Sequence, residues 1–188
     1  MIRRIEGFDK YVAITGFKDV KIKDANSLLS LVRKKTAGAE VQFFDSELIA
    51  SWQHLYFAVL NALKAFENRL NISDSLAVET LLYASAQRQI KKAVELLGIK
   101  PSSSNVAVVV LAETELKTSK TLETVLHLML GKRDDSVLEL TSKKFDGIKK
   151  LFGISELEQN AKLERKGMER KALTDLVIEH VALLALQR

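Results

Sequence analysis

The chain of 188 residues is 47% hydrophobic and 28% charged, and it contains no cysteine. These proportions predict one folded domain over residues 1–188, and they exclude disulfides, iron–sulfur clusters, thiolate zinc sites and cysteine nucleophiles. No apolar run approaches the roughly 18 to 20 residues of a membrane helix, and the N-terminus is charged, so we expect a cytoplasmic protein with no membrane partner. The net charge of +5 favours acidic or phosphate-rich partners.

The first part of the chain is predicted to alternate strands with helices. Residues 11–17 alternate in polarity and are rich in β-formers, which predicts a first strand. Asp24 is placed to cap a helix, and residues 40–44 supply a second strand. A long helix over residues 45–66, capped by Asp45, carries apolar side chains at three-to-four spacing. This helix should pack directly on the sheet.

The middle of the chain adds a second long helix and a central strand. The helix is predicted from Ser73 to Gly98, where glycine ends it, and it forms an α-hairpin with the preceding helix. Residues 106–112 are an almost continuous β-branched and aliphatic run, as expected of a strand buried on both faces. Another helix is predicted to start at Thr118 or Ser119.

The last part of the chain is predicted to be mainly helical. Residues 137–140 are interpreted as a short edge strand, and residues 145–152 as a short helix stopped by Gly153. Ser155 and Glu158 form a capping-box pattern ahead of a C-terminal helical region. Together the elements predict a helix-rich α/β (α+β) fold with a small mixed or antiparallel sheet of about four strands flanked by helices.

Residues that carry enzyme chemistry are scarce or scattered. The histidines His54, His127 and His180 lie on three different predicted helices, so a helical two-histidine metal motif is absent. No glycine-rich phosphate loop and no Gly-x-Ser-x-Gly nucleophile motif occurs. We interpret Asp134 and Asp135 as part of a solvated turn. We therefore expect no enzyme activity, no cofactor, no metal ion and no small-molecule substrate.

A strip of basic residues is predicted on the helical hairpin. Arg88, Lys91 and Lys92 fall on the second half of the second helix, where they would meet phosphates, with Tyr83 and His54 available to stack on bases. The alternative is that these charges only keep helix faces solvated. The candidate RNA-binding residues are His54, Lys64, Arg69, Tyr83, Ser85, Arg88, Gln89 and Lys92.

Two sequence blocks resemble a known family. Residues 45–58 read DSELIASWQHLYFA and residues 79–90 read ETLLYASAQRQI. These blocks resemble signature segments of the PRPK-binding (TPRKB-like, or CGI) family, the small subunit of the KEOPS tRNA-modification complex. The resemblance continues through residues 106–112, residues 118–121 and the leucine-rich C-terminal helix, so it covers nearly the whole chain.

The resemblance implies an adaptor and activator without an active site of its own. Members of the family in KEOPS bind its kinase-like ATPase subunit, whose neighbour is the catalytic subunit that threonylcarbamoylates an adenosine beside the tRNA anticodon. Archaeal members resemble tRNA recruiters that hold the single-stranded acceptor end. The partners implied for this chain are therefore the kinase-like ATPase subunit of KEOPS and the acceptor end of tRNA. A protein-interaction module without direct RNA contact remains the alternative.

The two implied roles are placed on two regions of the chain. Small side chains at residues 84–86 would leave room for a base near Tyr83 and His54, although they would equally allow the hairpin helices to pack closely. The kinase-like partner is expected on an apolar stripe of the C-terminal helix, whose alternative role is core packing. The stripe consists of Leu176, Val177, Val181 and Leu184.

Overall fold

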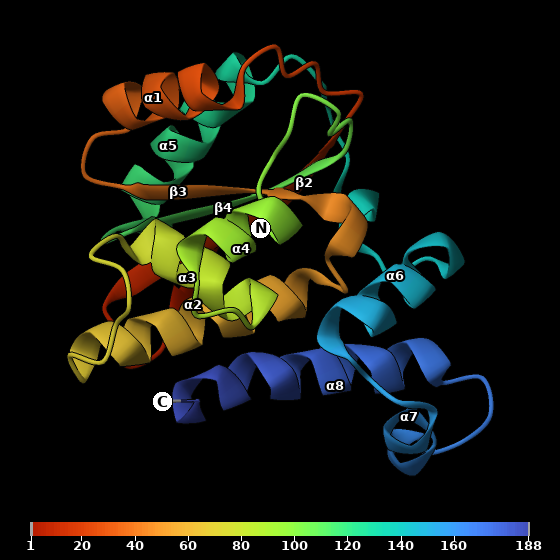
Figure 1. The fold of residues 1–188 in the computed structure, drawn as a ribbon. Coiled ribbons are helices and arrows are strands. Elements are labelled where there is room, and N and C mark those ends of the chain that lie inside the picture. The colour runs from red at the N-terminus through yellow and green to blue at the C-terminus, as the bar shows by residue number, and fades with distance from the viewer. Residues whose placement is uncertain (1, 188) are drawn as a thin grey trace.

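The computed structural model describes residues 2–187 and places one antiparallel sheet between two layers of helices (Figure 1). The strand order is β1-β2-β4-β3, and β5 pairs with the end of β2. The helix-rich α/β fold predicted from the sequence is confirmed, with one strand more than the four expected. The strands are β1 Ile2–Ile5, β2 Lys10–Lys18, β3 Glu40–Asp45, β4 Val106–Ala112 and β5 Lys132–Arg133.

The helices divide between the two faces of the sheet. Helices α1 and α5 cover one face, whereas α2, α3 and α4 cover the other, and α8 packs on the outer side of α2 (Figure 1). The helices are α1 Ala25–Lys35, α2 Trp52–Glu67, α3 Leu76–Ser85, α4 Ile90–Leu97, α5 Glu115–Leu128, α6 Ser142–Phe152, α7 Glu156–Lys162 and α8 Glu169–Leu183. Three 3-10 turns are η1 Ser46–Leu48, η2 Asp135–Leu138 and η3 Leu184–Leu186.

Strand β4 lies between β2 and β3, and all seven of its residues are buried. Because successive side chains of a strand point to opposite faces, Val108 and Val110 join the core under α1 and α5, and Val109 and Leu111 join the core under α2 and α3. The predicted central strand, buried on both faces, is confirmed.

Local capping patterns are also confirmed. The Asp24 carboxylate accepts hydrogen bonds from the backbone N–H groups of Asn26 and Ser27 at the start of α1. Ser155 and Glu158 form the reciprocal capping box that opens α7. The left-handed Gly153 ends α6, as predicted.

The single long helix predicted from Ser73 to Gly98 is wrong, because the chain leaves the helix after Ser85. Ala86 adopts a left-handed conformation with φ of 49°, and its N–H donates to the carbonyl of Tyr83. The break divides the segment into α3 and α4, so that residues 86–89 form a linker. Alanine gives no sequence signal for this conformation, which glycine or asparagine usually occupies.

Two other helix starts differ from prediction. Asp45 caps only the turn η1, and α2 begins after Ser51, whose hydroxyl accepts the His54 N–H at 3.1 Å. Helix α5 begins after Thr114, three residues before the nearer of its two predicted starts.

The predicted strand over residues 137–140 is a 3-10 turn and its exit. Asp135 accepts the Thr15 hydroxyl at 2.6 Å and the Gly16 N–H at 2.9 Å, and the Asp134 N–H donates to the Gly16 carbonyl. These bonds occupy the edge of β2, so no strand can pair there. Asp135 is therefore a structural partner of β2, while its side chain is 52% exposed in the turn η2, in agreement with the solvated-turn interpretation.

Gly16 permits this close approach. A Cβ atom at residue 16 would lie 2.2 Å from Val137 Cγ2 and 2.7 Å from the Asp134 carbonyl oxygen. We expect Gly16→Ala to lower the free energy of unfolding by about 2–3 kcal/mol, measured by urea denaturation. Gly147→Ala in α6 is the control, because its Cβ would meet only the flexible tip of Leu48 at 3.3 Å. Equal stabilities of the two variants would contradict the expectation.

Candidate functional site

The α3–α4 linker lies against the C-terminal turn of the chain. The Arg88 guanidinium donates to the main-chain carbonyl of Gln187, which joins residues 86–89 to the turn η3. Four large apolar side chains on the two segments that this bond joins are between 44% and 76% exposed. We call them the C-terminal patch: Ile90, Val94, Leu183 and Leu186. On α4 the first two lie one turn apart, on the same side of the helix.

Exposed cations accompany the patch. Arg88, Lys91 and Lys92 are exposed, and among residues 2–187 none of them forms an ion pair with an acidic side chain. Gln89 is exposed between them and precedes the first residue of α4. Cations without acidic neighbours keep their charge available for phosphate oxygens.

Lys64 and Arg69 are exposed but lie elsewhere. His54, near the start of α2, bonds to the end of α3, whereas Lys64 lies ten residues farther along α2, about 15 Å along the helix axis. Arg69 follows α2 in the chain, beyond its C-cap Asn68. The structure therefore brings neither residue to the cations around Arg88, and the continuous basic strip expected from the sequence is not formed.

His54 is fully buried and acts as a clamp between α2 and α3. Its Nε2–H donates to the Ala84 carbonyl at 2.7 Å, and its Nδ1 accepts the Ala50 N–H at 3.3 Å. Burial lowers the pKa of His54 to about 4, although the bond to Ala84 opposes the shift. The imidazole is therefore neutral near pH 7, and it lies too deep to stack on a base in this structure.

Tyr83 and Ser85 are also buried. The Ser85 hydroxyl donates to the carbonyls of Leu81 and Leu82, at 2.9 and 3.1 Å. Burial raises the pKa of Tyr83, which lies in the tightly packed α3. Ala84 and Ser85 are buried where α3 packs on its neighbours, which was the alternative to a base-binding surface, whereas Ala86 lies in the linker. Of the RNA-binding candidates, the five that are exposed are Lys64, Arg69, Arg88, Gln89 and Lys92.

The C-terminal stripe expected to bind a partner is core. Leu176, Val177, Val181 and Leu184 are all buried, and they pack beneath α2 and α6. Placing the partner on these four side chains therefore needs correction, because a terminal helix that packs on two others buries an apolar stripe of this width. The outward-facing Leu183 and Leu186 were missed because they interrupt the stripe's spacing.

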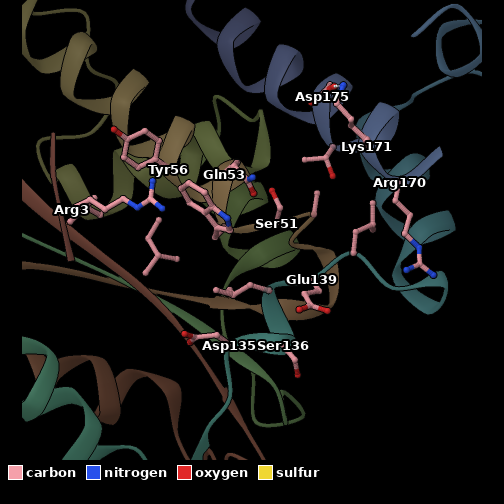
Figure 2. Close-up of a pocket in the computed structure, with 17 residues that line it drawn as sticks. Arg3, Ser51, Gln53, Tyr56, Asp135, Ser136, Glu139, Arg170, Lys171 and Asp175 are labelled. Atoms are coloured by element: carbon pink, nitrogen blue, oxygen red, sulfur yellow. Dashed lines mark hydrogen bonds and ion pairs between the residues drawn. The ribbon is translucent and has the colours of Figure 1, made fainter. Parts of the chain in front are cut away.

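A cleft of about 840 Å³ lies away from the C-terminal patch (Figure 2). Its walls come from β1 and β2, the start of α2, residues 135–140 and the first half of α8. The Arg3 guanidinium lies 4.3 Å from the centre of the Trp52 ring, and Tyr56 meets Trp52 edge-on. The sequence analysis missed this cleft because four segments far apart in the chain build it.

One buried lysine lies beneath the cleft. The Lys144 ammonium donates to the carbonyls of Val137 and Ile49, and burial lowers the pKa of this lysine to about 8 while nearby carboxylates oppose the shift. These bonds tie η2 to the segment that leads into α2. Within residues 2–187 no group of three or more potential metal ligands occurs, and no helix is long and apolar enough to cross a membrane.

Comparison with known proteins identifies the family. A family model described as kinase binding protein CGI-121 matches residues 17–185. The chain belongs to the CGI-121 family. The regulatory protein Cgi121 of Methanocaldococcus jannaschii is 31% identical over 117 residues, which make up 62% of this chain and 72% of that protein. The family resemblance found in the two sequence blocks is therefore confirmed.

The CGI-121 match includes the elements that surround the two surfaces described above, except β1, most of β2 and the last residues of the chain. The family is one of kinase-binding regulatory proteins. Its two sequence blocks meet in space, because His54 from the first block bonds to Ala84 from the second. The blocks that identify the family are thus joined through a structural contact.

The buried neutral His54 predicts acid-sensitive stability. Its pKa is about 4 in the folded protein and near 6.5 when unfolded, so protonation favours the unfolded state as pH falls between these values. We expect the unfolding free energy to decrease by about 3 kcal/mol over this range, measured by urea denaturation. His54→Gln should remove most of this decrease. The exposed His127→Gln is the control, and a parent-like pH dependence in His54→Gln would disprove the assignment.

Proposed function

We propose that this protein is a non-catalytic, cytoplasmic regulatory subunit of KEOPS. It binds the kinase-like ATPase subunit and the single-stranded acceptor end of tRNA, and it thereby supports threonylcarbamoyladenosine modification of tRNA. The observation that carries the proposal is the CGI-121 family match over residues 17–185. The absence of a motif for catalysis in the sequence agrees with a subunit that acts by binding.

The RNA part of the proposal is supported by the exposed cations beside the α3–α4 linker. Arg88 and Lys92 are not neutralised by carboxylates among the described residues, and Gln89 offers an amide that can both donate and accept hydrogen bonds. Because aromatic candidates in this region are buried, binding here would depend on phosphate contacts more than on base stacking.

The burial of His54, Tyr83 and Ser85 favours a second candidate function. Without those side chains the surface lacks the aromatic platform that single-stranded RNA usually needs. The protein would then be a protein-interaction module that touches the kinase-like subunit alone. The two functions differ in one measurable property, which is whether tRNA affinity depends on the acceptor end.

The kinase-binding part of the proposal is supported by the C-terminal patch. Four exposed apolar side chains gathered around one junction are the kind of surface that a protein partner covers. Arg88 provides a charged group beside the patch, and its bond to the Gln187 carbonyl holds the guanidinium in place. We therefore propose this patch, in place of the buried stripe of α8, as the docking surface for the kinase-like subunit.

The first test concerns tRNA. We expect Arg88→Glu combined with Lys92→Glu to weaken tRNA binding and to reduce the salt dependence of log affinity by about 1.4, since each contact to a single-stranded phosphate contributes about 0.7. Filter binding over a salt series measures both quantities. The matched control is Lys34→Glu with Lys35→Glu on α1, which covers the opposite face of the sheet.

A comparison of intact tRNA with tRNA lacking its single-stranded end separates the two functions. The acceptor-end role would be supported if trimmed tRNA binds more weakly than intact tRNA and if this difference disappears selectively in the Arg88/Lys92 variant. Equal affinity for both tRNAs would leave the interaction module as the function.

The second test concerns the kinase-like subunit. We expect Val94→Arg with Leu186→Arg to weaken that complex by about tenfold or more, because two charges would be buried at the interface without partners. Titration calorimetry measures the affinity. Leu116→Arg with Leu130→Arg is the control, since both residues are exposed and lie outside the patch. Unchanged affinity in the patch variant would remove this surface from the interface.

A further inference from the structure

The cleft of Figure 2 takes part in neither of the surfaces proposed above. It opens beside the start of α2 and the first half of α8, whereas the C-terminal patch surrounds the last turn of the chain. A hollow of about 840 Å³ with aromatic and polar walls falls in the size range of ligand-binding sites.

The walls present polar groups that the protein itself does not use. Among residues 2–187, the side chains of Gln53, Tyr56, Glu139 and Thr174 form no hydrogen bond or ion pair with another side chain or with the main chain. Between them they offer donors and acceptors suited to the N–H and C=O groups of a peptide. Apolar side chains of Val12, Ile14, Leu138 and Leu140 complete the lining.

The charges of the cleft narrow the class of ligand. Its lining contains three cations and three anions, which are Arg3, Arg170, Lys171, Asp135, Glu139 and Asp175. Lys171 is paired with Asp175 at 3.3 Å and with Glu164 at 2.7 Å, and Asp135 is bonded to Thr15 and Gly16. Asp135 also lies 3.9 Å from Arg133, so the lining charges that form no ion pair are two cations and one anion. The anion, Glu139, also favours the charged form of the nearby Lys144.

Figure 2 shows how these three side chains are distributed over the cleft. Arg3 and Arg170 lie toward opposite ends of the cleft in Figure 2, with Glu139 on the wall between them. Arg3 lies over the Trp52 ring, and Arg170 donates only to the neutral Ser142 hydroxyl at 3.0 Å. A nucleic-acid strand places a phosphate at every residue, and the central carboxylate would repel it. A peptide can alternate the sign of its charges and so match these side chains.

We propose that the cleft is a docking groove for an extended segment of a partner protein whose charges run acidic, basic, acidic. The acidic side chains pair with Arg3 and Arg170, and the basic side chain pairs with Glu139. Main-chain groups of the segment bond to Gln53, Tyr56 and Thr174, and its apolar side chains cover Trp52. The groove is thus a second protein-binding site, separate from the C-terminal patch.

The single tryptophan makes the cleft directly observable. Trp52 is the only tryptophan of the chain and lines the cleft, so its fluorescence reports a ligand there when the ligand has none. The probes are synthetic peptides with aspartate, lysine and aspartate separated by roughly two to five residues, a spacing series that covers extended spans of different length. We expect a saturable change in Trp52 emission, with peptides of reversed charge bound about tenfold more weakly.

Charge exchange tests the pairing more strictly. Glu139→Lys should transfer the preference to peptides with an acidic central residue, and Arg170→Glu should transfer it to peptides with a basic residue at that end. Arg3→Glu makes the same charge exchange at the other end of the cleft, and Arg4→Glu is its matched control. Arg4 follows Arg3 on β1, its side chain points to the other face of the sheet, and it pairs with Asp9 at 3.1 Å.

Three results would overturn the proposal. They are the absence of a saturable signal across the whole spacing series, tighter binding of a single-stranded RNA oligonucleotide than of any peptide, and a uniform loss of affinity in Glu139→Lys without a change of preference. Thermal unfolding of each variant verifies that it is folded. Neither tRNA nor the kinase-like subunit is present in this assay, so its outcome is independent of the adaptor function proposed above.

Discussion

The burial of β4 on both faces is the constraint on which the rest of the molecule depends. Seven consecutive apolar residues must be kept from water on two sides, while their backbone groups pair with β2 and β3. One helical layer, α1 and α5, covers the first side, and α2 with α3 covers the second. Helix α8 then buries the remaining apolar surface of α2, and both candidate surfaces lie along its length.

The contact between α2 and α3 shows that a histidine, a residue type common in active sites, can have a structural role. The Ala84 carbonyl belongs to the last turn of α3, where carbonyl groups have no partner within the helix, and the Ala50 N–H lies just before α2. The two nitrogen atoms of His54 satisfy both groups. A neutral imidazole is the side chain that can donate at one nitrogen and accept at the other, so a buried histidine meets a need that apolar side chains cannot.

Sequence patterns predicted the elements that depend on residues close together in the chain. The apolar run of β4, the Asp24 cap and the Ser155 capping box depend on neighbouring residues, and all are present. The break at Ala86 could not be predicted, because it depends on a left-handed alanine held by bonds to the preceding turn. The periodicity of a single helix also gave the wrong exposure for His54 and for the α8 stripe. The helices that carry them pack against more than one neighbour, so a wider arc of each helix surface is buried.

The candidate site was predictable only in part. The exposure of charged residues such as Arg88 and Lys92 could be predicted from the polarity of the residues around them. Prediction of the cleft would have required knowing how four distant segments meet. Arg3 was not considered as a functional residue, because β1 was not predicted and nothing near it in sequence suggests Trp52 as a neighbour.

The strand order also has a consequence for how the chain folds as it is synthesised. Among residues 2–187, strand β3 pairs only with β4, although sixty residues separate the end of one from the start of the other. The N-terminal half of the protein therefore carries an incomplete sheet until residue 112 has left the ribosome, and its apolar edge depends on late, long-range pairing. The four-stranded order is completed only when β4 enters between β2 and β3, two strands that are synthesised before it.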